Sequence, residues 1–133
     1  MKKRVTGIGG IFFKADDPEK LGAWYAKHLQ LPIEDWGGAS FKWREKENSE
    51  REGYTIWSPF QSDTEYFEPS KKPFMINFRV ENLDAVLEQL RAEGVTVDDK
   101  KEESEFGKFG WIMDPEGNRI ELWEPPASPS EGK

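Results

Sequence analysis

Two stretches of the chain share one pattern of apolar and polar positions. Residues 11–19 read Ile-Phe-Phe-Lys-Ala-Asp-Asp-Pro-Glu, and residues 76–84 read Ile-Asn-Phe-Arg-Val-Glu-Asn-Leu-Asp. In both, a segment with the period-two alternation of a strand runs into the start of a helix. Asp17 and Asn82 stand where an N-cap residue belongs, and Pro18 follows at a position that a helix tolerates. The pattern therefore predicts a chain built from two similar halves.

Each predicted helix start is followed by apolar residues at helical spacing, which indicates an amphipathic helix. These residues are Leu21, Trp24, Tyr25 and Leu29 in the first half, and Leu83, Val86, Leu87 and Leu90 in the second. Gly94 is placed to end the second helix, because glycine adopts the left-handed conformation found after helix ends.

Three strands are expected after each helix, at residues 32–36, 39–44 and 54–59 and again at 95–98, 106–113 and 119–123. The sequence Asp-Pro-Glu-Gly-Asn at 114–118 is typical of a tight turn between the last two. Each half therefore reads β-α-β-β-β. We expect one domain over residues 1–124, with halves at about 6–60 and 73–124, a polar linker at 58–73 and a flexible tail at 125–133.

Composition narrows the class of protein. The 133 residues include 9 Phe, 6 Trp and 3 Tyr, which is enough bulky material for a core although 34% of the residues are charged. The absence of cysteine excludes disulfides, zinc–thiolate sites and thiol catalysis. Apolar runs are too short to span a membrane, and the basic N-terminus is followed by no apolar region of a signal peptide. We therefore expect a cytoplasmic protein that binds no membrane.

The net charge of −7 makes nucleic acid a poor partner, because phosphate binding needs a basic face. A cationic or neutral small molecule is electrostatically easier to bind. The repeat also indicates where such a molecule would bind. The helix of a β-α-β-β-β half covers only one face of its sheet and leaves the other face open. Two halves set edge to edge can curl into a cupped sheet whose concave side is a cleft.

Three features of the sequence resemble the vicinal oxygen chelate superfamily, which includes glyoxalase I, bleomycin-resistance proteins, extradiol dioxygenases and fosfomycin-resistance enzymes. They are the repeated halves, the aromatic pair Trp24 and Tyr25 on the first helix, and the segment Asp-Pro-Glu-Gly-Asn-Arg-Ile-Glu-Leu at 114–122. The resemblance covers nearly the whole chain. It implies an α+β fold in which two βαβββ modules form one cupped mixed sheet.

The resemblance also implies where metal ligands would lie in metal-dependent members. These positions fall on Gly10, Met75 and Glu121, and only Glu121 can bind a hard divalent ion. The strand at 54–59, where glyoxalases place another carboxylate, contains no acid. The single histidine, His28, is expected on the surface of the first helix. We therefore expect no metal and no other cofactor.

Strand alternation predicts which side chains line the cleft. The candidate ligand-binding residues are Phe12, Lys14, Trp43, Trp57, Met75, Asn77, Arg79, Trp111 and Glu121. Tryptophan rings stack on flat or cationic ligands, and Arg79 or Lys14 could pair with an anionic group. The tryptophans could equally serve in packing or in the interface of a homodimer, and Arg79 could form an internal ion pair with Glu121.

Three functions stay open at this stage. The first is a non-enzymatic protein that binds a small organic molecule in a Trp-rich cleft as a homodimer. The second is a glyoxalase-type lyase or isomerase, or another metal-dependent enzyme, with ligands displaced to residues such as Gln61, Glu65 and Glu68 of the linker. The third is a metal-free enzyme in which Glu121 is a general base beside Arg79.

Overall fold

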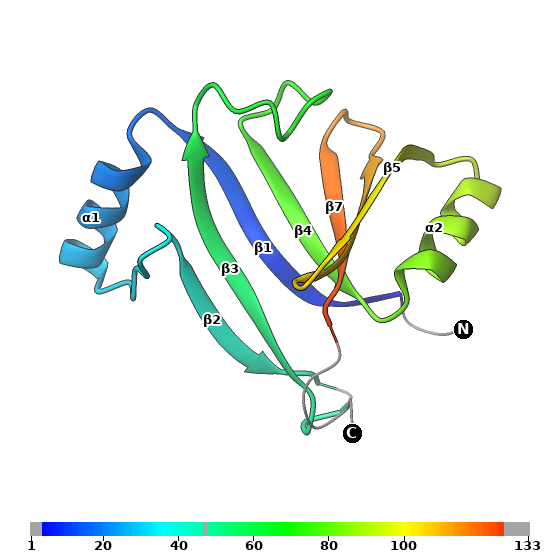
Figure 1. The fold of residues 1–133 in the computed structure, drawn as a ribbon, viewed down its shortest axis with the longest axis horizontal. Coiled ribbons are helices and arrows are strands. Elements are labelled where there is room, and N and C mark those ends of the chain that lie inside the picture. Colours follow the sequence, from blue (N-terminus) through cyan, green and yellow to red (C-terminus); the bar gives the residue numbers. More distant parts are fainter. Residues whose placement is uncertain (1–3, 47, 127–133) are drawn as a thin grey trace.

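The computed structural model describes residues 4–46 and 48–126. Within them, two helices accompany one seven-stranded mixed sheet (Figure 1). The elements are β1 (Val5–Ala15), α1 (Pro18–Leu29), β2 (Ala39–Arg44), β3 (Glu52–Gln61), β4 (Phe74–Val80), α2 (Leu83–Ala92), β5 (Thr96–Ser104), β6 (Gly107–Met113) and β7 (Arg119–Glu124). The predicted flexible tail lies mostly outside the described residues, since residues 127–133 are not among them.

The sheet brings the two halves together at its centre. Its strand order is β2-β3-β1-β4-β7-β6-β5. The first strands of the halves, β1 and β4, pair antiparallel, and each pairs on its other side with a parallel strand from its own half, β3 or β7. The side chains that the two halves direct to one face therefore meet across the β1–β4 seam.

Both helices begin as the sequence predicts. The Asp17 side chain accepts a hydrogen bond from the Lys20 backbone N–H at 3.1 Å, and the Asn82 side chain accepts one from Ala85 at the same distance. These side chains satisfy backbone donors that the first turn leaves free. Gly94 follows the second helix with a φ of 85°, a conformation that glycine adopts without strain.

The strand expected at residues 32–36 is not formed, so the first half is β-α-β-β while the second is β-α-β-β-β. The segment instead closes a tight turn, in which the Gly37 N–H donates to the Glu34 carbonyl at 2.9 Å and the Glu34 N–H donates to the Gly38 carbonyl at 2.8 Å. Pro32 has no N–H to offer to a neighbouring strand, which explains why this segment does not extend the sheet.

Each helix covers one end of the outer face of the sheet. Helix α1 packs on β3 and β1, whereas α2 packs on β5, β6 and β7. The second arrangement forms the aliphatic core of the molecule, built on Val80, Leu83, Val86, Leu87 and Leu122. His28 is exposed on α1, as predicted, and its ring lies 4.9 Å from that of Trp24. Neither helix of the described chain is long and apolar enough to cross a membrane.

Candidate functional site

Glu121 lies at the centre of the inner face of the sheet. Strand pairing sets it opposite Asn77 of β4 on one side and Trp111 of β6 on the other. Only 2% of the Glu121 surface is exposed, and its two neighbours are equally covered, at 2% for Asn77 and 1% for Trp111. The alternation of the sequence predicted that these three side chains share one face, and the structure brings them together.

Three neutral donors hold the Glu121 carboxyl group. The Asn77 side-chain amide donates to Oε1 at 2.6 Å, and the Trp111 indole N–H donates to Oε2 at 3.0 Å. The Tyr66 hydroxyl also donates to Oε2. Both carboxyl oxygens are therefore occupied by protein donors, and the group is satisfied without contact with an ion or a ligand.

Burial and hydrogen bonding act on the protonation of Glu121 in opposite directions. Burial raises the pKa of the Glu121 carboxyl group, while the donors Tyr66, Asn77 and Trp111, and the charge of Arg119, oppose the rise. Burial also raises the pKa of the Tyr66 hydroxyl, and the charge of Glu121 adds to the rise. Tyr66 thus keeps its proton and stays a donor.

The close approach of Asn77 to the seam requires glycine in β1. A β-bulge interrupts the β1–β4 pairing between Ile8 and Gly10, and a Cβ on Gly9 would lie 2.3 Å from the Asn77 Oδ1 atom and 2.9 Å from a ring carbon of Trp123. No donor among the described residues reaches Oδ1 of Asn77. The amide is therefore fixed by its one bond to Glu121 and by packing.

Residues 62–70, which we name the strap, cover the inner face at one end. They follow β3 and reach across the sheet toward β7 (Figure 1), where the Arg119 guanidinium donates to the Tyr66 carbonyl. Phe67 is fully buried and packs with Met75 and Trp111, and Phe12, Phe60, Tyr66 and Phe109 pack around this cluster. Lys14, another predicted cleft residue, holds its ammonium group 5.9 Å from the centre of the Phe67 ring.

The roles of Tyr66 and Phe67 were missed by sequence analysis, which treated residues 58–73 as a polar linker. A signal was present, because Tyr-Phe is an aromatic pair within an otherwise polar run. Such a pair is costly to leave in water and so indicates a segment that folds back on the core.

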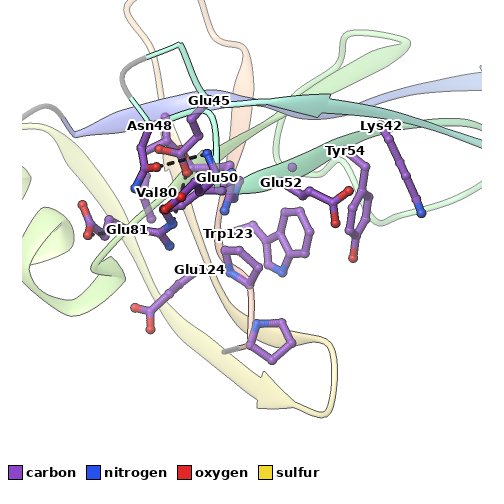
Figure 2. A pocket seen from close by; sticks show the side chains of 16 residues that line it. Lys42, Glu45, Asn48, Glu50, Glu52, Tyr54, Val80, Glu81, Trp123 and Glu124 are labelled. Carbon is purple, nitrogen blue, oxygen red and sulfur yellow. Dashed lines mark hydrogen bonds and ion pairs between the residues drawn. The ribbon is translucent and has the colours of Figure 1, made fainter. Parts of the chain in front are cut away.

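An open cavity of about 850 Å³ lies at the other end of the inner face (Figure 2). Trp123, which is 6% exposed, and Tyr54 of β3 form its aromatic wall, with ring centres 5.6 Å apart. Acidic side chains outnumber basic ones along the lining. The acids are Glu45, Glu50, Glu52, Glu81 and Glu124, and the bases are Lys42, Arg51 and Arg79.

Two of the three basic residues are engaged in ion pairs. Arg79 contacts Glu45 at 3.1 Å, and Arg51 contacts Glu45 at 3.5 Å and Glu81 at 3.3 Å. The internal ion pair between Arg79 and Glu121, considered as an alternative from the sequence, is therefore not formed. Arg79 pairs with Glu45 instead. Arg79 also stacks on Trp43, with its guanidinium carbon 5.5 Å from the ring centre.

Trp57 faces away from the cup. Its register partner is Ile11, and its ring packs against Phe13 at 5.2 Å and against Tyr25 of α1 at 4.7 Å. The structure thus places Trp57 on the outer face, because the phase of β3 directs Ile56 inward beside Gly10. Phe12, Met75, Asn77, Trp111 and Glu121 form the inner cluster, with Lys14 at its strap end, and Arg79 lines the open cavity.

Comparison with known proteins gives the family. The model of a glyoxalase-like domain matches residues 10–123, which is most of the chain. The chain belongs to the glyoxalase-like family. This assignment places it in the vicinal oxygen chelate superfamily and confirms the α+β fold expected from the repeats. No curated protein sequence matches this glyoxalase-like chain.

Solved structures share the fold of this glyoxalase-like chain at low sequence identity. Methylmalonyl-CoA epimerase from Mycobacterium tuberculosis is 20% identical, with a TM-score of 0.59, 95% of this chain covered and 92% of the epimerase. A variant of the Streptomyces coelicolor methylmalonyl-CoA epimerase in complex with 2-nitronate-propionyl-CoA is 16% identical, with a TM-score of 0.67, and the coverage is 92% and 99%. A Legionella pneumophila protein described as NAD-dependent benzaldehyde dehydrogenase is 17% identical, with a TM-score of 0.57 and coverage of 88% and 98%.

The residues present do not fit the metal of the metal-dependent members. Gly10 offers no donor atom, Met75 offers only a thioether, and both oxygens of Glu121 accept bonds from protein donors. Across residues 4–46 and 48–126, no group of three or more His, Cys, Asp or Glu side chains could hold a metal ion. The chemistry of this site therefore has to be sought in its own side chains.

Proposed function

We propose that this glyoxalase-like protein binds a small organic cation that carries a planar apolar part, in the open cavity and without a catalytic metal. The observation that supports the proposal is the lining, in which Tyr54 and Trp123 stand among five carboxylates. Its volume of about 850 Å³ suits a ligand of drug-like size.

The distribution of charge favours a cation. Glu45 and Glu81 already neutralise Arg51 and Arg79, and Glu124 accepts a hydrogen bond from the Leu83 N–H at 2.8 Å. Of the lining residues, this leaves Glu50 and Glu52 with Lys42. Glu52 stands two residues before Tyr54 on the same strand, so its carboxylate and the aromatic wall face the same way (Figure 2). A ligand can place its apolar part on the rings and its charge beside Glu52.

Glu121 has a structural role in this proposal. Glu121 stands two residues before Trp123 on β7. Its carboxyl oxygens already accept hydrogen bonds from Asn77, Trp111 and Tyr66. The group holds β4, β6 and the strap together, which positions Trp123 in the aromatic wall of the cavity. The general-base role and the metal-ligand role weighed from the sequence both need a free carboxylate oxygen.

Titration of tryptophan fluorescence with a library of cationic aromatic compounds, and with neutral analogues of the same shape, tests the proposal. Cationic members are expected to quench emission with saturation, and added salt is expected to weaken their binding. Failure of every cationic member to change the emission would contradict the proposal.

Substitution localises the binding. Tyr54→Ala is expected to weaken binding by roughly five- to thirtyfold, and Glu52→Gln by roughly two- to fivefold. Glu116→Gln is the matched control, because this exposed carboxylate lies in the turn between β6 and β7, outside the cavity lining. Equal affinity in all three variants would place the ligand elsewhere.

A further inference from the structure

The guanidinium group of Arg79 is buried in the lining of the open cavity without a hydrogen bond at its innermost nitrogen. The side chain is 7% exposed, and its Nη1 atom lies 3.1 Å from the Oε2 atom of Glu45. This contact brings opposite charges together, but neither atom has a hydrogen-bond partner within residues 4–46 and 48–126. Because buried polar atoms are nearly always hydrogen-bonded, these two indicate a group arranged for a partner from outside the chain.

Neutralisation of its charge leaves the donors of Arg79 available. A guanidinium group has several N–H donors in a planar fork, and a contact with one oxygen cannot satisfy them all. The same Oε2 atom of Glu45 also faces Arg51, at 3.5 Å. Arg79 therefore shares this carboxylate with a second guanidinium, and it lacks the paired, parallel hydrogen bonds that a carboxylate can accept from its fork.

Packing holds Arg79 in a fixed position. Its guanidinium carbon lies 5.5 Å from the centre of the Trp43 ring, and the Trp43 indole N–H donates to the Thr55 hydroxyl at 2.9 Å. Trp43 in turn lies close against β1 and β3, because a Cβ on Gly7 or Gly53 would come within 2.4 Å of its ring. A guanidinium that is positioned before a ligand arrives loses little conformational entropy on binding.

Arg79 is also a neighbour of the aromatic wall of the cavity. It is the register partner of Trp123, whose ring centre lies 5.6 Å from that of Tyr54. Glu52 stands two residues before Tyr54 on β3, and its carboxylate lies beside that ring (Figure 2). A planar ligand on these rings can therefore extend one group toward Arg79 and another toward Glu52.

We propose that the ligand of the open cavity carries a carboxylate as well as its cationic group, with the carboxylate on Arg79 and the amine beside Glu52. This inference rests on the function proposed above and narrows the ligand class to aromatic zwitterions. A carboxylate matches the guanidinium fork and supplies the hydrogen bonds that Glu45 does not make. The acidic lining repels an anion that has no amine, so both charges belong to one molecule.

Two compounds of matched shape test the proposal. They are para-aminomethylbenzoate, a zwitterion, and para-aminomethylbenzamide, which keeps the ring and the amine but has no negative charge. Isothermal titration calorimetry of the full chain at neutral pH measures both affinities, and the benzoate is expected to bind roughly three- to thirtyfold more tightly. Equal or tighter binding of the benzamide would overturn the zwitterion and leave the cation proposal standing. Failure of both compounds to bind would overturn both proposals.

Substitution locates the carboxylate of the ligand. In Arg79→Met the ratio of the two affinities is expected to fall to about one, whereas a loss of structure alone would weaken both compounds together. Combining Arg79→Met with Glu45→Gln should give the same ratio, and it leaves no unpaired carboxylate behind if the single variant folds poorly. Lys42→Met tests the other cation of the lining, and the benzoate should still bind more tightly in that variant. A preference that survives in both Arg79 variants, or that is lost in Lys42→Met, would overturn the proposal.

Discussion

The carboxyl group of Glu121 lies in an apolar part of the cup where each of its hydrogen-bond donors is neutral. Tyr66, Trp111 and Asn77 supply the three bonds. Because burial raises the pKa of Glu121 in the folded protein, the ionised form is less favourable there than in the unfolded chain. Glu121 thus fixes the local structure, and we expect it to make the stability of the protein depend on pH.

We expect Glu121→Gln to stabilise the protein at neutral pH. Below the ordinary glutamate pKa of about 4.3, the Glu121 carboxyl group of the wild type is protonated in both the folded and the unfolded protein. Wild type and variant therefore differ little in stability there. As the pH rises through the raised pKa of Glu121, folding of the wild type becomes less favourable while that of the variant does not. Glutamine also retains the bonds if the Asn77 amide turns and offers its free Oδ1.

Thermal unfolding of both proteins between pH 4 and pH 8 measures this effect. The advantage of Glu121→Gln over the wild type should grow with pH. A constant difference across the range, or an advantage that shrinks as the pH rises, would show that the carboxyl group ionises without cost in the folded protein.

Among the inner residues, sequence analysis could predict those whose direction follows from strand alternation alone. Asn77, Trp111 and Glu121 lie on strands with regular pairing. Because side chains alternate between the two faces along such strands, the sequence was enough to predict that these three share a face. Tyr66 lies outside any strand, and its position depends on contacts with Arg119 and Glu121 that are distant in the sequence. No local pattern encodes such contacts.

At the scale of elements, the strap connects the two halves and closes one end of the cup. Its anchor is Phe67, which is completely buried against Met75 and Trp111. A segment with no regular secondary structure stays in place by such contacts, because it has no ladder of backbone hydrogen bonds to hold it.

We expect Phe67→Ala to lower the free energy of unfolding by about 3–5 kcal/mol, since it removes a large buried ring and leaves a cavity. Phe106→Ala, at an exposed position, should change it by less than about 0.5 kcal/mol. Urea denaturation of the two variants measures both values. Similar stabilities would mean that the strap is not part of the cooperative fold.

Two element-scale differences between expectation and structure have local physical causes. Ile33 and Trp36 suggest a strand at residues 32–36, but Pro32 and the turn that Gly37 and Gly38 close prevent pairing. In the opposite direction, β5 extends to Ser104 through a charged run, because an edge strand with both sides near water tolerates charges. Composition alone misleads at both places.

At the scale of the whole molecule, the two faces of one sheet differ in chemical character. The inner face has a satisfied carboxyl group and an acidic aromatic cavity, and the outer face has apolar pairs such as Ile11–Ile76 along the β1–β4 seam. The duplicated halves form one shared sheet, as the sequence repeat predicted. The chemical character of its faces depends on single side chains and could not be read from the repeat.

Addition of Ni²⁺, Zn²⁺ or Mn²⁺ should leave the melting temperature of the chelator-treated protein unchanged at neutral pH. Binding to the folded state alone would raise that temperature with metal concentration. Calorimetry with and without each ion makes the measurement, and Glu121→Gln is the control. A rise in melting temperature that disappears in Glu121→Gln would contradict this prediction. It would show that Glu121 binds metal and that its three hydrogen-bond donors move away.

Nuclear magnetic resonance of the indole N–H groups tests the central claim most directly, because the chain has 6 tryptophans and each gives its own signal. Substitution of Trp111 or Trp123 by phenylalanine assigns the two signals that matter. Titration with a cationic aromatic compound should shift the Trp123 signal to saturation and leave that of Trp111, bonded to Glu121, in place. A ligand that moves the Trp111 signal and not that of Trp123 would contradict the account, because it would show that the ligand enters at Glu121.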